Sequence, residues 1–213
     1  MNNPWEDIGL ETYERHMSLD SVGQLQALSD IMKEQFDAYP VSTAMVLGVA
    51  GGNGLGHIDT GKYKKVYGVD INAQYLQAVS QRFESLSGVL ECLRADLTNE
   101  AQNLPQAQLI IADLLVEYIG YAAFGRAVTQ VRPEYVSCVI QINTDSGGWV
   151  SESPYIHAFE RLSEVHYQMS EEELSDTMKA EGYSLIFSQT KPLPNGKALR
   201  RLDYKKQRSD ENV

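Results

Sequence analysis

The size and charge of the chain exclude several classes of protein. Its 213 residues are 43% hydrophobic and 22% charged, which fits one soluble domain with a full core. A formal net charge of −11 repels a polyphosphate and argues against a nucleic-acid partner. No apolar stretch reaches the roughly 18 residues that a membrane span needs, so no membrane partner is expected.

The N-terminus and the cysteines predict neither export nor a metal site. Residues 1–7 contain no basic start and no apolar run, so we expect no secretory signal and a cytoplasmic protein. Cys92 and Cys138 stand alone in apolar runs, without a CxxC partner. We therefore expect buried thiols and no metal ligands.

The first clear element is a helix over about residues 21–39. Asp20 or Ser21 can cap its start, and Pro40 ends it. Apolar residues recur along it at spacings of three and four, which places them on one helix face. These residues are Val22, Leu25, Leu28, Met32 and Phe36.

Strands and helices then alternate along the chain. Each strand is a near-continuous apolar run, which predicts a parallel sheet covered by helices on both faces. The predicted helices span residues 72–86 and 114–131. The predicted strands span residues 44–49, 66–70, 89–94, 108–113 and 135–142.

The C-terminal part ends differently. After helical material between about residues 154 and 181, two strand-like runs span residues 183–190 and 198–206. The six-residue link between them is too short for a parallel crossover, so the two strands form an antiparallel hairpin. The prediction is a doubly wound, mostly parallel, seven-stranded α/β sheet over residues 41–213, preceded by a helical extension or lid over residues 1–40.

A glycine-rich loop follows the first predicted strand. The sequence Gly48-Val49-Ala50-Gly51-Gly52-Asn53-Gly54 lets the backbone turn sharply and approach a ligand closely. Ligands of open α/β sheets bind at the C-terminal ends of the strands, where this loop lies.

Three aspartates end or follow the next strands at the same edge. Asp70 closes the second strand, Asp96 follows the third and Asp113 ends the fourth. A carboxylate after the second strand can accept both hydroxyl protons of a ribose. Asp96 or Asp113 taken singly could equally be a helix N-cap.

Over about residues 44–206 these features resemble the class I S-adenosylmethionine (SAM)-dependent methyltransferases, a Rossmann-like family. The resemblance implies that the glycine loop lies against the methionine part of the cofactor, through Gly48, Val49, Gly52 and Asn53. The family's loop usually begins with an acidic residue and then a glycine, whereas this chain has Gly48 and Ala50 at those places. One contact to the methionine end is thereby lost.

The resemblance also implies roles for the strand ends. Asp70 would hold the cofactor's ribose, with Ile71 packing on its adenine. Asp96 would meet the adenine amino group, with Leu97 beside it.

The end of the fourth strand is implied to border both cofactor and acceptor, through Asp113 and Leu114. One turn further on, Glu117 is our candidate for a general base or substrate anchor, and Tyr118 for a substrate contact. Asn143 and Thr144, just past the fifth strand, could line the same cleft.

The N-terminal stretch and the remaining histidines offer further candidates. If residues 5–17 form a lid, Tyr13 would contact the acceptor and His16 would serve in catalysis; the alternative is a surface helix anchored by Trp5 and Tyr13. We expect a solvated or packing role for His157 and His166.

A basic cluster lies near the C-terminus. We favour a solvated face of an edge strand plus its tail, with a patch for an anionic substrate or partner as the alternative. Its members are Lys197, Arg200, Arg201, Lys205, Lys206 and Arg208.

These features predict SAM-dependent methyl transfer, an in-line displacement, to a small-molecule acceptor. The acidic charge and single-domain size favour a small molecule over a nucleic acid, and a protein acceptor is the nearest rival. One alternative is a non-catalytic protein that binds an adenosyl ligand. Another is a nicotinamide-dependent oxidoreductase, but its GxGxxG fingerprint would need a glycine where this chain has His57.

Overall fold

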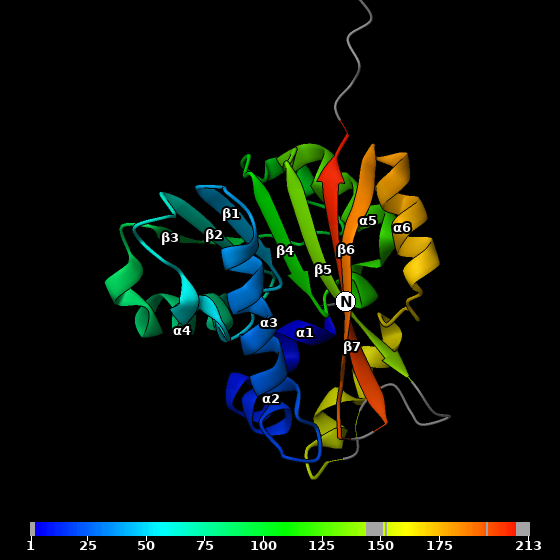
Figure 1. Ribbon diagram of the computed structural model, residues 1–213. Coiled ribbons are helices and arrows are strands. Elements are labelled where there is room, and N and C mark those ends of the chain that lie inside the picture. Colours follow the sequence, from blue (N-terminus) through cyan, green and yellow to red (C-terminus); the bar gives the residue numbers. More distant parts are fainter. Residues whose placement is uncertain (1–2, 144–150, 152, 195, 208–213) are drawn as a thin grey trace, which may run out of the picture.

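The computed structural model describes residues 3–143, 151, 153–194 and 196–207, in which seven strands form a single sheet (Figure 1). The strand order is β3-β2-β1-β4-β5-β7-β6. The strands are β1 (Thr43–Leu47), β2 (Lys65–Asp70), β3 (Leu90–Arg94), β4 (Leu109–Asp113), β5 (Tyr135–Asn143), β6 (Tyr183–Pro192) and β7 (Lys197–Lys206).

Helices cover both faces of this sheet. The α-helices are α1 (Pro4–Asp7), α2 (Leu10–Met17), α3 (Gln24–Ala38), α4 (Ala73–Arg82), α5 (Val116–Val131) and α6 (Glu171–Ala180). Short 3₁₀ helices are η1 (Leu55–His57), η2 (Glu84–Leu86), η3 (Ala101–Asn103) and η4 (Ile156–Glu164).

The two-residue period of a strand explains the two layers of helices. In β1, Met45 and Leu47 point into the core beneath α5 and α6, whereas Ala44 and Val46 point into the core beneath α3 and α4. All four side chains are buried. A central strand that is buried on both faces therefore reads as a continuous apolar run.

The predicted architecture is confirmed. Strands β1 to β5 pair in parallel, and β7 pairs antiparallel with both β5 and β6. From β1 the chain proceeds outward to β2 and β3, then returns to β4 on the other side of β1. This reversal between β1 and β4 is where a doubly wound sheet forms its ligand crevice.

Two helices differ from their predicted form. Helix α3 begins at Gln24 instead of about residue 21, because Gly23 takes a left-handed conformation (φ 64°) at its N-cap. Helix α5 is kinked at Gly120, where φ is 74°. Positive φ values favour glycine.

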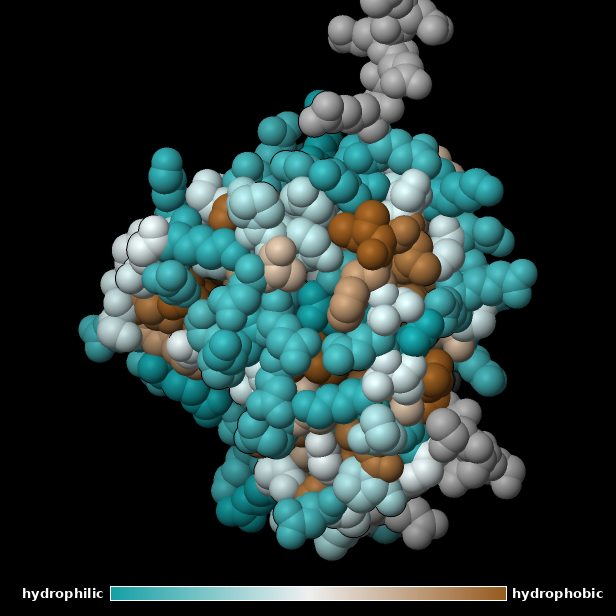
Figure 2. All heavy atoms as spheres, in the orientation of Figure 1, coloured by the Kyte–Doolittle hydropathy of each residue, from teal (hydrophilic) through white to brown (hydrophobic). Residues whose placement is uncertain are grey.

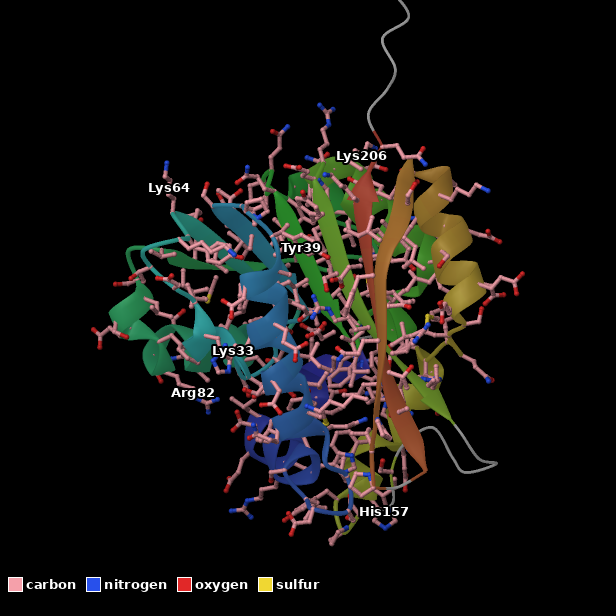
Figure 3. The ribbon with its side chains drawn as sticks, in the orientation of Figure 1. Lys33, Tyr39, Lys64, Arg82, His157 and Lys206 are labelled. Carbon is pink, nitrogen blue, oxygen red and sulfur yellow. The ribbon has the colours of Figure 1, made fainter. Side chains whose placement is uncertain are left out.

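The prediction that the basic cluster is the solvated face of an edge strand is wrong for Lys197 and Arg201. Strand β7 lies inside the sheet, between β5 and β6, and the side chains of Lys197 and Arg201 are buried. Arg201 forms an ion pair with Asp203 at 2.6 Å, and Tyr39 donates to the same carboxylate at 2.6 Å. Figure 3 shows Tyr39 over the centre of the sheet. Arg208 lies outside the described residues.

The edge strand on this side is β6, and it exposes an apolar patch. Leu185, Ile186 and Phe187 are 42–47% exposed, and the register shifts between Leu185 and Phe187. Figure 2 shows brown surface in this part of the molecule. No helix in the described part of the chain has both the length and the apolar character of a membrane span.

Replacing Arg201 with Met should lower the free energy of unfolding by about 3 kcal/mol, because it leaves Asp203 buried without its cation. The matched control is Arg200→Met, which removes the half-exposed pair with Glu171 and should cost less than about 1 kcal/mol. Urea denaturation measures both. Equal losses in the two variants would contradict this account of Arg201.

Candidate functional site

A pocket opens at the C-terminal ends of β1, β2 and β4, under the N-terminal helices and η4. Its empty space, including the open mouth, is about 1130 Å³. Eleven of the residues predicted for the site line it: Tyr13, His16, Gly48, Asp70, Ile71, Asp96, Leu97, Asp113, Leu114, Glu117 and Tyr118.

The start of the glycine loop is shaped by its neighbours. Gly48 has φ 71°, and a Cβ added there would lie 2.9 Å from Cδ1 of Leu115. Any side chain at this position would therefore be strained by the positive φ and would require the Leu115 side chain to shift. Ala50, at the next departure, adopts φ 45°, and its N–H donates to Oδ2 of Asp70 at 2.9 Å.

Three predicted loop residues do not line the pocket. Val49 is buried in the core beneath α3 and α4. A Cβ added at Gly52 would lie 2.5 Å from the ring of Phe83, so this glycine permits close packing. The side-chain amide of Asn53 donates to the carbonyl of Leu25 at 2.8 Å and ties the loop to α3.

Asp70 is buried at the end of β2 and is held by the backbone. Its Oδ2 accepts from Ala50 N, and its Oδ1 accepts from Asn72 N at 2.9 Å. Burial raises the pKa of Asp70, and these hydrogen bonds oppose the rise. The carboxylate is thus fixed in direction before any ligand arrives.

Asp96 caps its own turn after β3. Its Oδ1 accepts from the N–H and the hydroxyl of Thr98, and its Oδ2 accepts from the amide of Asn99 at 2.8 Å. Burial raises the pKa of Asp96, but these hydrogen bonds outweigh it and hold the pKa below the usual value. The N-cap-like role considered from the sequence is present, and the residue also lines the pocket.

Asp113 ends β4 with one satisfied and one unsatisfied oxygen. Its Oδ1 accepts from Nε2 of Gln35 at 2.8 Å. Its Oδ2 is buried and finds no hydrogen-bond partner among the described residues. Burial raises the pKa of Asp113 to about 7, against the opposing effects of the Gln35 hydrogen bond and the charge of Arg201.

Glu117 lies in the first turn of α5 and is 5% exposed. Within the described part of the chain its Oε2 has no hydrogen-bond partner. Burial raises the pKa of Glu117 to about 8, and the nearby carboxyl of Asp113 adds to the rise. Two carboxyl groups of the pocket lining, those of Asp113 and Glu117, thus each have a buried oxygen that no described residue satisfies.

Aromatic side chains from the N-terminal segment and from α5 meet over these carboxyls. Trp5 packs edge-on against Tyr13 (ring centroids 5.9 Å apart) and against Tyr118 (4.8 Å). Burial raises the pKa of the Tyr13 phenol, and the carboxylates of Asp70, Glu14 and Glu117 add to this effect.

Polar contacts fasten the N-terminal segment to the sheet edge. The amide of Asn72 donates to the carbonyl of Trp5 at 2.9 Å, and the Tyr75 hydroxyl donates to that of Ile8 at 2.8 Å. Arg82, labelled in Figure 3, pairs with Glu14 at 2.6 Å and donates to the carbonyl of Gly51. The segment is therefore bound to the rest of the site.

The histidines divide between the pocket and the surface. His16 is buried, its Nδ1 lies 2.8 Å from the hydroxyl of Ser153, and burial and the charge of Lys197 lower its pKa. His166 lines the pocket, and burial lowers its pKa too. His157 is exposed at one end of the molecule (Figure 3) and pairs with Glu160.

Some lining residues were missed by sequence reasoning. Gln24 at the start of α3 and Gln141 in β5 line the pocket, and their amides are joined by a hydrogen bond of 2.8 Å. The signal was a polar residue inside the apolar run of β5. Of the residues expected near this point, Asn143 ends β5, and Thr144 lies outside the described residues.

Several solved structures resemble this fold at low sequence identity. N-methyltransferase NodS from Bradyrhizobium japonicum WM9, in complex with S-adenosylhomocysteine (SAH), matches 97% of this chain and 100% of its own, with a TM-score of 0.66 and 12% identity. Magnesium protoporphyrin IX methyltransferase from Synechocystis PCC 6803, with bound SAH, matches 93% of this chain and 94% of its own, with a TM-score of 0.64 and 11% identity. The chain has the class I methyltransferase fold.

This methyltransferase fold is not confined to methyltransferases. The [4+2]-cyclase SpnF matches 89% of this chain and 84% of its own, with a TM-score of 0.64 and 10% identity. No family model and no curated protein matches the sequence.

The raised pKa of Glu117 predicts a specific pH dependence of stability. A carboxyl whose pKa is higher in the folded than in the unfolded state stabilises at low pH, and this stability is lost as the pH rises toward about 8. Between pH 5.5 and 8.5 the wild type should therefore lose roughly 3 kcal/mol more free energy of unfolding than Glu117→Gln.

Urea denaturation at several pH values measures this difference. Glu172→Gln, which changes an exposed carboxylate, serves as the control and should follow the wild type. A curve for Glu117→Gln parallel to that of the wild type would refute the raised pKa.

Proposed function

We propose that this protein is a SAM-dependent methyltransferase that acts on a small-molecule acceptor. The observation that carries the proposal is the meeting of a positive-φ glycine loop and three strand-end aspartates in one pocket. Structural neighbours in complex with SAH or SAM support it through their shared fold.

The residues present fit the adenosine part of SAM. Asp70 offers a buried, oriented carboxylate to the two ribose hydroxyls. Ile71 and Leu97 provide apolar contacts for the adenine, and Asp96 an acceptor for its amino group.

The methionine part of SAM would lie near Gly48, which has no acidic side chain, and near Asp113 at the adjacent strand end. The register pairs Leu47 with Ala112, so Gly48 and Asp113 follow at adjacent strand ends. We infer that Asp113 supplies the negative charge that the first loop position lacks. Its Oδ2 is buried, and none of the described residues bonds to it, which suits a ligand's ammonium group.

Bound SAM would supply an activated methyl group on a sulfonium. The residues of this chain would then hold the acceptor in line with that group and exclude water. We propose that α1 and α2 form the lid for this purpose. Tyr13 and Trp5 line the pocket. The ion pair between Glu14 and Arg82 lies between the lid and the glycine loop. We also propose that Glu117, not His16, is the group nearest the acceptor, because Glu117 has a buried oxygen that no described residue satisfies.

A second candidate is an adenosyl-ligand-binding protein of the same fold that does not transfer methyl groups. The cyclase among the neighbours favours keeping it, since the fold also carries other functions. Affinity for SAM without transfer to any acceptor would distinguish it.

Calorimetric titration tests the proposed function. SAM and SAH should bind with dissociation constants in the micromolar range, roughly −8 kcal/mol, whereas NAD and NADP should not bind. Asp70→Ala should abolish binding of both adenosyl ligands, because it removes the ribose acceptor, and the exposed Asp176→Ala should leave it unchanged. No heat with either adenosyl ligand would reject the methyltransferase proposal.

The role of Asp113 makes a separate prediction. Asp113→Asn should weaken SAH binding about tenfold or more, the value of a hydrogen bond to a charged group. It should leave the affinity for 5′-methylthioadenosine unchanged, because that ligand has no ammonium group. An equal loss for both ligands would show that Asp113 serves the adenosine part instead.

A further inference from the structure

Glu117 gives the pocket a buried carboxyl that the proposed contacts to the cofactor's adenosine and ammonium do not use. We propose that the methyl acceptor is an amine, whose nitrogen binds at the carboxylate of Glu117 against the rings of Trp5, Tyr13 and Tyr118. This inference rests on the proposed methyltransferase function and names the substrate class of that same site.

The charge of the pocket favours a cationic acceptor. The ionisable acidic groups in its lining are Asp70, Asp96, Asp113 and Glu117, and none of the described lining residues is Lys or Arg. Burial lowers the pKa of both lining histidines, which keeps them neutral near pH 7. An acceptor that carries a carboxylate or phosphate next to Glu117 would be repelled.

The position of Glu117 suits recognition of one polar atom. It is 95% buried, and its Oε2 faces no hydrogen-bond donor from the described chain. The backbone at this point is anchored, because the carbonyl of Glu117 accepts from Tyr167 N at 2.7 Å. An unsatisfied buried oxygen on an anchored backbone is costly unless a ligand supplies a donor, and an ammonium offers three.

The aromatic wall adds a second preference for positive charge. The ring centroid of Trp5 lies 4.8 Å from that of Tyr118 and 5.9 Å from that of Tyr13, with near-perpendicular planes, so the three rings form one cluster in the pocket lining. Aromatic faces attract ammonium groups, most strongly where water is excluded. A hydroxyl acceptor would gain little from these rings and would leave a Glu117 carboxylate uncompensated.

Glu117 can also accept the proton that such an acceptor must lose. An alkylammonium must lose one proton before its nitrogen has a lone pair, and the Glu117 carboxylate can take that proton. The lone pair then forms the new N–C bond to the methyl group, the pair of the broken C–S bond returns to sulfur, and the positive charge ends on the methylated nitrogen.

Matched ligand sets test the proposal by binding, independently of turnover. With the protein saturated by SAH, calorimetry compares an amine, an alcohol and a carboxylate on each of three bodies. The sets are phenethylamine, 2-phenylethanol and 3-phenylpropanoate; tryptamine, tryptophol and indole-3-propanoate; and hexylamine, hexanol and hexanoate. In at least one set the amine should bind about tenfold more tightly than its two counterparts. If no amine exceeds its own alcohol and carboxylate, the proposal is overturned.

Variants identify the residues responsible. Glu117→Gln should remove the preference for the amine while the dissociation constant for SAH stays within about twofold, and the exposed Glu172→Gln should change neither. Trp5→Leu should weaken amine binding more than Trp5→Phe, which keeps an aromatic face. An amine preference that survives in Glu117→Gln would overturn the assignment to this residue.

Transfer of labelled methyl from SAM to the preferred amine completes the test. It should occur in the wild type and not to the matching alcohol. Wild-type protein that binds SAM but methylates only an alcohol or carboxylate would overturn the amine assignment and leave the proposed function standing. Protein that binds neither SAM nor SAH would reject the proposed function itself.

Discussion

The main physical constraint on the candidate site comes from two neighbouring carboxyl groups, those of Asp113 and Glu117. Asp113 and Glu117 line the pocket, and each has a buried oxygen that no described residue satisfies; burial raises the pKa of both. Leaving such groups charged and unpaired is costly, so they are either protonated or paired with a cation. Under the proposed function, SAM would bring a cation to Asp113 and an amine acceptor would bring one to Glu117.

The scaffold around the pocket holds Asp113 in place. Gln35 from α3 donates to Asp113 and also to Ser137 in β5, and Ser137 donates in turn to Asp203 in β7. Arg201 balances the charge of Asp203. The buried Arg201 of the basic cluster thus serves an internal network that joins the hairpin to the candidate site, which explains why a cation lies in the interior of an acidic protein.

Sequence reasoning predicted the sheet because its signals are local. Apolar runs showed the strands, and the short link from residue 191 to 196 allowed only a hairpin. It failed where the environment of a residue depends on segments that are far away in the sequence. Arg201 resembles a surface residue until β7 is placed between β5 and β6. Gln24 and Gln141, 117 positions apart, meet only in the fold.

Proton release on cofactor binding tests the central claim most directly. Titration of the protein with SAM at pH 7, in buffers of different ionisation enthalpy, measures the protons exchanged. The ammonium group of SAM beside Asp113 lowers the pKa of that carboxyl, so binding should release protons into the buffer, and Asp113→Asn should release fewer. Binding without proton release, or with proton uptake, would contradict the claim that Asp113 receives the cofactor's positive charge.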